Sequence, residues 1–300
     1  TPGGEFLAVG SDDDRVYLFK NGSSAPLWSY STGGNVKDVR ISDDLSYIVA
    51  GSIDDKLYLI KRTSGSKLWS TDLGADVSIV AISSDSSRLA AVAGDTLYFF
   101  NSSSSTALWS KDYGHTITSM SMSSDASRIV VGLSNGTLQL VSTSGSSSVI
   151  WTYYSSTSIN FADMSYDGER IVMSNNANKV FSFTNATNIA QWEYTSTTSI
   201  VGLKLGGNGS NVIVSFNDQS FALFNSDSSV PLWHYTAWND IESSGISKGG
   251  EVIYTGTDNS KVLKFLKNPW GSGFVGNLEY NQDHWEATFN ATKITFEEFS

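Results

Sequence analysis

Six tryptophans divide most of the chain into nearly equal lengths. They are Trp28, Trp69, Trp109, Trp151, Trp192 and Trp233, at spacings of 41, 40, 42, 41 and 41 residues. Eight positions after each tryptophan comes a β-branched apolar residue: Val36, Val77, Ile117, Ile159, Ile200 and Ile241. A period of roughly 40 residues, kept over six copies, is typical of propellers and solenoids, in which each copy is one supersecondary unit.

Each repeat has the pattern of four short strands. In the repeat at residues 36–71, apolar runs occur at residues 36–42, 48–51, 57–60 and 68–70, with turn-forming residues between them. Helical periodicity is absent through residue 267. Four strands linked by tight turns predict a radial blade, so we expect an all-β fold, a seven-bladed β-propeller of four-stranded antiparallel blades.

The repeat boundaries predict a propeller over residues 1–270 and a C-terminal segment over residues 271–300. The expected blades cover residues 1–30, 36–71, 77–111, 117–153, 159–194, 200–235 and 241–270. Residues 5–30 align with the last three strands of a repeat, so the first blade lacks its innermost strand. An unpaired strand edge favours pairing with another segment.

The C-terminal segment is the candidate for that missing strand, because residues 289–300 are β-prone. The candidate closing residues are Ile294, Phe296 and Phe299. Closure within one chain is favoured because the segment is tethered to the last blade. The alternative is donation of this strand to a neighbouring copy, which would build an open filament.

The repeat resembles the PQQ-like, tryptophan-docking propeller family, which overlaps with WD40-like repeats. The resemblance rests on the strand at residues 57–60, the turn and tryptophan at residues 63–69, and the Gly-containing segment at residues 73–77. Residues 1–5 and 165–169 also resemble a turn of WD40-like propellers. The sequence departs from the quinoprotein dehydrogenases in having seven predicted blades rather than eight, no cysteine and no long insertions.

The six repeat tryptophans are predicted to be structural docking residues. Each opens the outer strand of its blade, so its ring can lie between adjacent blades while the indole N–H reaches a neighbouring carbonyl. Stacking on carbohydrate is the alternative role for these rings.

No pattern in the sequence predicts a catalytic, cofactor-binding or metal site. The three histidines, His115, His234 and His284, lack metal-ligand spacing, and cysteine is absent. The acidic run 12–14 aligns with turn residues of the other repeats, so a turn explains it better than calcium does. We therefore expect no cofactor.

Six Asn-x-Ser/Thr sequons are candidate glycosylation sites. Their acceptor residues are Asn21, Asn101, Asn135, Asn185, Asn208 and Asn290. About this number is expected by chance in a chain so rich in serine and threonine, so glycosylation is an expectation that depends on the organism.

Charge and composition limit the kinds of partner. The net charge of −11 disfavours nucleic acid, and no apolar run is long enough for a membrane helix. The surface is poor in charge and rich in hydroxyl groups, which favours an extracellular or cell-surface location. We expect a non-catalytic structural or protein-interaction module, whose partners are other protein subunits, including copies of itself. The alternative is a quinoprotein-like or carbohydrate-active propeller that uses the central channel.

Overall fold

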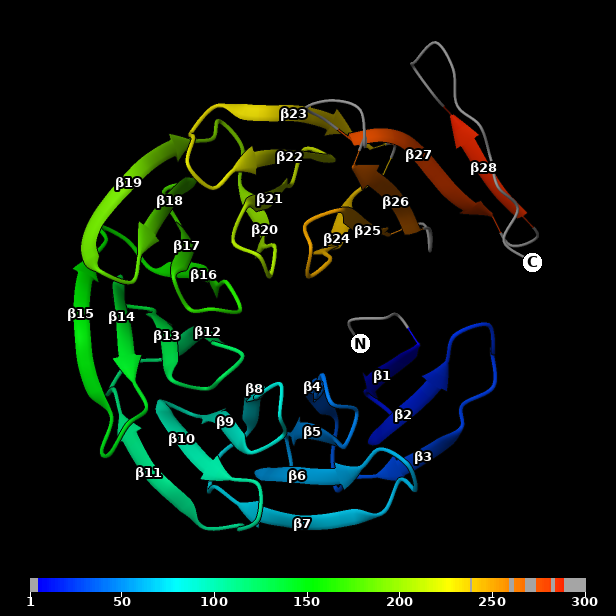
Figure 1. The fold of residues 1–300 in the computed structure, drawn as a ribbon, viewed down its shortest axis with the longest axis vertical. Helices are drawn as coiled ribbons and strands as arrows, with labels where there is room; N and C mark the ends of the chain where they lie inside the picture. Colours follow the sequence, from blue (N-terminus) through cyan, green and yellow to red (C-terminus); the bar gives the residue numbers. More distant parts are fainter. Residues whose placement is uncertain (1–4, 238, 259–261, 268–273, 282–283, 289–300) are drawn as a thin grey trace. The chain divides into compact units, whose positions relative to one another are not determined.

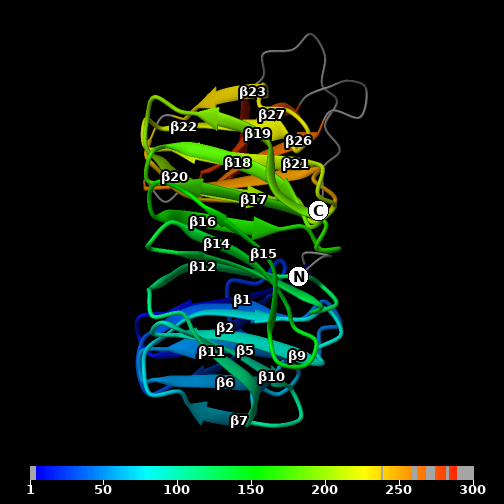
Figure 2. The same cartoon turned by 90° about the vertical axis from the view of Figure 1, so that its left-hand side faces the viewer.

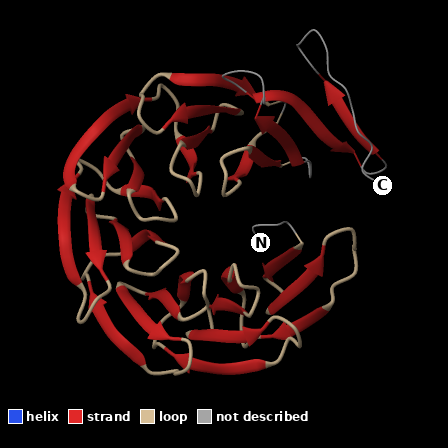
Figure 3. Cartoon of the chain, viewed as in Figure 1, coloured by secondary structure: helices blue, strands red, loops and turns tan. Residues whose placement is uncertain are grey.

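The computed structural model describes residues 5–237, 239–258, 262–267, 274–281 and 284–288. Within these residues the regular structure is entirely β-strand (Figure 3), and no helix there could cross a membrane. The strands form seven sheets, of which the first has three strands, the next five have four, and the last has five. The chain divides into two compact units, residues 1–195 and 196–300, and each is considered by itself.

Every sheet is an antiparallel meander whose strands follow the order of the sequence (Figure 1). The first strands of the sheets begin with the β-branched residue that follows each tryptophan. All six pair with the second strand through a register shift after this residue, which is a bulge. The first strands are β4 (Val36–Ile41), β8 (Val77–Ile82), β12 (Ile117–Met122), β16 (Ile159–Met164), β20 (Ile200–Leu205) and β24 (Ile241–Ile246).

The second strands are the most deeply buried. In β5, β9, β13 and β17 every residue after the first is buried, and β21 is buried throughout. A continuous apolar run is the pattern of a strand covered on both faces. The second strands are β1 (Phe6–Ser11), β5 (Tyr47–Ser52), β9 (Arg88–Ala93), β13 (Arg128–Leu133), β17 (Arg170–Asn175), β21 (Asn211–Phe216) and β25 (Val252–Thr257).

The third strands continue the buried layer and supply most of its aromatic rings, among them Phe100, Phe183 and Phe221. Burial of one such side chain stabilises the fold by about 1.5–3 kcal/mol. The third strands are β2 (Arg15–Lys20), β6 (Lys56–Lys61), β10 (Thr96–Asn101), β14 (Thr137–Ser142), β18 (Lys179–Thr184), β22 (Ser220–Asn225) and β26 (Val262–Lys267).

Six of the fourth strands contain the repeat tryptophans, and three of these, β3, β11 and β23, alternate strictly between half-buried and exposed residues. This alternation is expected where one face of a strand packs and the other meets solvent. The fourth strands are β3 (Trp28–Ser31), β7 (Lys67–Asp72), β11 (Ala107–Asp112), β15 (Ser148–Tyr154), β19 (Thr187–Thr195), β23 (Pro231–Thr236) and β27 (Phe274–Asn281); β28 (His284–Thr288) follows as a fifth strand.

The hydrophobic core lies between successive sheets rather than within one sheet. In the unit of residues 1–195, one cluster joins Val130 and Leu138 of the fourth sheet to Ile159 and Phe183 of the fifth. The other clusters of this unit likewise join neighbouring sheets, which Figures 1 and 2 show following one another in sequence order. The clusters explain why the sequence repeats, because every sheet must present the same two apolar faces to its neighbours.

The predicted fold class, a seven-bladed β-propeller, is confirmed, and the first sheet has three strands among the described residues. The strands β27 and β28, which follow the predicted boundary at residue 270, pair with the last sheet. Residues 277–281 alternate polar and apolar residues, a β pattern that continues the last sheet beyond the Pro and Gly residues in the sequence at 269–273. The candidate closing residues Ile294, Phe296 and Phe299 lie outside the described residues.

Candidate functional site

Four of the repeat tryptophans form the hydrogen bond that their position predicts. Each indole N–H donates to a main-chain carbonyl in the next sheet, from Trp28 to Arg62 (2.7 Å), Trp69 to Ser102 (2.7 Å), Trp109 to Thr143 (3.4 Å) and Trp151 to Asn185 (3.0 Å). Trp192 is 9% exposed. Trp233 packs against Phe221 and Phe265, with ring centroids 5.3 and 5.7 Å apart.

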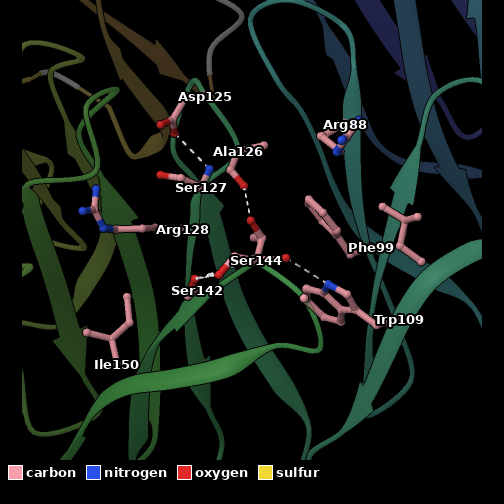
Figure 4. A pocket seen from close by; sticks show the side chains of 13 residues that line it. Arg88, Phe99, Trp109, Asp125, Ala126, Ser127, Arg128, Ser142, Ser144 and Ile150 are labelled. Carbon is pink, nitrogen blue, oxygen red and sulfur yellow. Dashed lines mark hydrogen bonds between the residues drawn. The ribbon is translucent and has the colours of Figure 1, made fainter.

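A pocket borders one of these tryptophans, Trp109. It has a volume of about 740 Å³ and lies between the third and fourth sheets, beside Trp109 and Phe99 (Figure 4). Two arginines border it, but each guanidinium donates to a main-chain carbonyl: Arg88 to Ser87 (3.1 Å) and Arg128 to Asp167 (3.4 Å). The figure shows the two arginine side chains on opposite sides of the group, so they do not converge on one ligand position. We therefore interpret the pocket as the groove beside the docked Trp109 ring, between two sheets, rather than as a ligand-binding site.

The turns between first and second strands join one sheet to the next. In the third sheet, Ser83 donates to Asp85 (2.6 Å), and so does the backbone N–H of Ser87 (3.0 Å). These bonds hold the pKa of Asp85 below its ordinary value, with the Ser83 hydroxyl as the largest cause. The backbone N–H of Ser84 then donates to Ser124 O in the next sheet (2.8 Å). The acidic residue therefore orders a turn that bonds two blades.

The acidic run at residues 12–14 is part of a hairpin, as predicted. Asp14 has φ of 67°, and Asp55 at the same place in the next repeat has φ of 65°. Asp13 accepts a hydrogen bond from Tyr17 (2.5 Å), and Asp54 accepts one from Tyr58. Burial, followed by this bond to Asp54, raises the pKa of Tyr58. Asp is one of the residues that tolerate the left-handed conformation, so turn chemistry explains these carboxylates.

Ionisable residues of the first strands bond to neighbouring strands. Asp38 of β4 accepts a hydrogen bond from the backbone N–H of Val80 in β8 (3.0 Å) and lies 3.5 Å from Arg40. Asp163 of β16 accepts one from Ser121 of β12 (2.9 Å). These carboxylates therefore act within the framework of the unit of residues 1–195.

The described histidines come from different parts of the chain. His115 lies in the loop between β11 and β12 and His234 lies on β23; both are exposed, and the side chain of His284 is not among those described. No group of three His, Asp or Glu side chains in the described part of the chain could hold a metal ion.

The candidate glycosylation residues differ in accessibility. Asn21, Asn135 and Asn208 are exposed, whereas Asn101 and Asn185 are half-buried. The amide of Asn208 donates to Gly249 O (2.6 Å), so a glycan there would have to share the amide with this bond. Asn290 lies outside the described residues, and glycosylation stays a prediction at all six.

The structure shows a surface that our sequence analysis missed. The residue before a repeat tryptophan is aliphatic and exposed in five repeats: Leu27 (53%), Leu68 (40%), Leu108 (54%), Ile150 (44%) and Leu232 (44%). We call these five residues the rim aliphatics. The sequence already contained this signal, which is the aliphatic residue directly before the tryptophan. Neighbouring residues along a strand face opposite sides, so a tryptophan that packs inward places the residue before it in solvent.

Among the described residues, four of the rim aliphatics lie on the fourth strand of a four-stranded sheet, and Leu27 immediately precedes β3, the last strand of the first sheet. In the described four-stranded sheets of the unit of residues 1–195, the fourth strands β7, β11, β15 and β19 end the strand order. Val149 (42% exposed) and Ile189 (70%) add to the apolar surface on β15 and β19. Exposed apolar residues on a strand edge are a usual feature of protein-interaction surfaces.

Comparisons with known proteins support the fold. A family described as outer membrane protein assembly factor BamB matches residues 1–108. The structure is similar to the β-propeller domain of Cps50 (Swd1) from Myceliophteria thermophila, with a TM-score of 0.73 and 11% identity, covering 87% of this chain and 92% of that one. No curated protein sequence matches the chain. The resemblance to PQQ-like and WD40-like propellers is thus confirmed at the level of the fold.

Proposed function

We propose that this protein is a non-catalytic structural subunit of an extracellular or cell-surface assembly, and that its partners are protein subunits, including copies of itself. The rim aliphatics are the observation that supports this most directly, because five repeats expose an apolar residue at the same place. Single exposed apolar residues are ordinary, but a repeated series along strand edges favours association with protein.

The chemistry of the first strands agrees with a structural role. Asp38 and Asp163 are engaged in bonds between strands rather than directed together at one point. Enzymes instead gather ionisable groups with perturbed pKa values at one place. The low content of charged residues, 16%, supports an extracellular or surface location by composition.

The association can be tested with a triple variant, Leu68→Ser, Leu108→Ser and Ile150→Ser. We expect the purified parent to self-associate with rising concentration in sedimentation equilibrium, and the variant to associate at least tenfold more weakly. The variant should keep its unfolding temperature, since all three side chains are at least 40% exposed. Tyr254→Ser, which removes an exposed aromatic from a second strand, is the matched control and should associate like the parent. A parent that stays monomeric at every concentration contradicts the self-association.

The alternative is an enzyme or a cofactor-binding propeller of the quinoprotein or carbohydrate-active kind. The proposal predicts protein from the native source without a stoichiometric quinone chromophore or transition metal, because the sequence has no cysteine and its histidines lack metal-ligand spacing. An absorption spectrum and elemental analysis measure both quantities. One equivalent of either would establish the alternative.

A further inference from the structure

The junction between the third and fourth sheets departs from the repeat at three places. The junctions on either side of it, between the second and third sheets and between the fourth and fifth, share one set of contacts. All of these sheets belong to the unit of residues 1–195, so their contacts can be compared directly. Because a repeat places the same contact at every junction, a departure marks a junction that is held together differently.

The first departure concerns how closely two sheets approach each other. The fifth residue of β5 is Gly51 and that of β13 is Gly132, and an added Cβ on either would lie 2.6–2.7 Å from a methyl group of the first residue in the next sheet. The fifth residue of β9 is Val92, which is fully buried. Its side chain fills the space that the glycines leave empty. Ile117, the first residue of β12, therefore cannot approach β9 as closely as its counterparts approach β5 and β13.

The second departure concerns the hydrogen bonds between first strands. Asp38, the third residue of β4, accepts a hydrogen bond from the backbone N–H of Val80 in β8 (3.0 Å). Ser119, the third residue of β12, donates to Ala162 O in β16 (3.0 Å) and accepts from the backbone N–H of the same residue (2.8 Å). The third residue of β8 is Ile79, whose side chain has no polar atom. Among the described residues, β8 and β12 share no hydrogen bond.

The third departure concerns the ring against which the tryptophan packs. The tryptophans of the second and fourth sheets lie 6.0 and 5.7 Å from a phenylalanine ring of the next sheet, Phe100 and Phe183. The fourth sheet has Val141 at that place, and Trp109 stacks instead on Phe99 of its own sheet, with ring centroids 5.1 Å apart (Figure 4). Its hydrogen bond to the fourth sheet is 3.4 Å long, against 2.7–3.0 Å at the other three junctions. The 740 Å³ pocket lies at this weaker contact.

Polar contacts still cross this junction, but water can replace them. The backbone N–H of Ser84 donates to Ser124 O (2.8 Å), and Lys111 of β11 donates to Gln139 Oε1 of β14 (3.0 Å). Burial lowers the pKa of Lys111, and its acceptor here is a neutral amide rather than a carboxylate, which makes the weaker kind of bond. Because water offers the same groups new partners, breaking these bonds costs little net free energy.

We propose that the unit of residues 1–195 opens reversibly between its third and fourth sheets, so that the first three sheets move as one part and the fourth and fifth as another. Opening exposes the stacked rings of Phe99 and Trp109 to solvent. Leu108 and Ile150 border the pocket from opposite sheets, so opening also changes the distance between two rim aliphatics. Parts of a fold that few bonds join separate at a lower free-energy cost than the whole fold unfolds. Opening needs no second copy, so it is independent of the proposed function.

Two neighbouring alanines of β9 provide a matched test, because the chain has no cysteine of its own. Ala90 packs in the core between the third and fourth sheets, and Ala91 packs in the core between the second and third; both are fully buried. A buried thiol reacts only when its junction opens. We therefore expect Ala90→Cys to react with Ellman's reagent at least tenfold faster than Ala91→Cys. Its rate should change little in urea below the unfolding transition, since local opening exposes little surface.

The unaltered chain gives a second measurement. The same turn bond, 2.8 Å long, runs from the N–H of Ser84 to the fourth sheet and from the N–H of Ser124 to the fifth. Both residues are half-buried. In amide hydrogen exchange followed by nuclear magnetic resonance, we expect the Ser84 amide to exchange at least tenfold faster than the Ser124 amide.

Urea unfolding of both cysteine variants controls for a change in global stability. If Ala90→Cys unfolds at lower urea than Ala91→Cys, the amide exchange of the unaltered chain decides. Equal exchange of the Ser84 and Ser124 amides overturns the proposal. So does equal labelling of two equally stable variants, or labelling of Ala90→Cys that rises with urea as steeply as global unfolding does.

Discussion

Replacement of Trp151 by Ala is expected to lower the free energy of unfolding by about 3–5 kcal/mol, the usual cost of removing a large buried aromatic side chain. Trp151 is 8% exposed, its indole N–H donates to Asn185 O (3.0 Å), and its ring lies 5.7 Å from that of Phe183 in the next sheet. The substitution removes packing and a hydrogen bond at the junction of two sheets. Urea-induced unfolding, followed by tryptophan fluorescence and by far-ultraviolet circular dichroism, measures the change.

Two further variants separate the contribution of the Trp151 ring packing from that of its hydrogen bond and from that of its neighbour. Trp151→Phe keeps a ring but loses the N–H donor, leaving Asn185 O without this bond, so a smaller loss of about 1–2 kcal/mol is expected. Ile150→Ser alters the adjacent exposed residue and should change stability by less than about 0.5 kcal/mol. If Trp151→Ala unfolded like the parent but failed to bind a partner, the docking tryptophan would be a recognition residue instead.

The repeat was predictable because the same physical requirement recurs in every blade. Each sheet must bury two apolar faces and dock one indole, so tryptophan and the β-branched residue eight positions later recur at fixed offsets. The hairpin at Asp54 and Asp55 was also predictable from the sequence, because a turn conformation restricts which residue types can occupy it. A packing requirement that is the same in each repeat therefore leaves the same residue pattern in each repeat of the sequence.

The end of the propeller was less predictable because its repeat is irregular. Residues 274–281 were assigned to the C-terminal segment, whereas β27 (Phe274–Asn281) is the fourth strand of the last sheet. This strand lacks the repeat tryptophan, so the pattern that marks the other fourth strands is absent from it. The side-chain bonds that join sheets, such as Asp38 to the N–H of Val80, were also not predictable, because they depend on distances between strands 42 residues apart in sequence.

A close approach between the backbones of two sheets yields the second large expected effect. Gly51 of β5 lies against the first residue of β8, and an added Cβ would lie 2.6 Å from Val77 O and 2.7 Å from a Val77 methyl group. Real Cβ atoms essentially never come this close, and the carbonyl is fixed by the backbone of its strand. We expect Gly51→Ala to lower the free energy of unfolding by about 3 kcal/mol, at the upper end of the usual cost of overpacking.

Substitutions at two other strand glycines, Gly132 and Gly245, serve as controls for Gly51→Ala. At Gly132 an added Cβ would meet an Ile159 methyl group at 2.6 Å, but its three nearest neighbours are all side-chain atoms, so Gly132→Ala should cost less than Gly51→Ala. At Gly245, in β24, nothing lies within 4 Å, and Gly245→Ala should be neutral or stabilising by up to about 1 kcal/mol. In thermal and urea unfolding, Gly245→Ala should therefore be the most stable of the three variants, Gly132→Ala the next, and Gly51→Ala the least stable. Equal stability of the Gly51 and Gly245 variants would show that the second and third sheets can separate without cost, which is incompatible with the packing that the repeat requires.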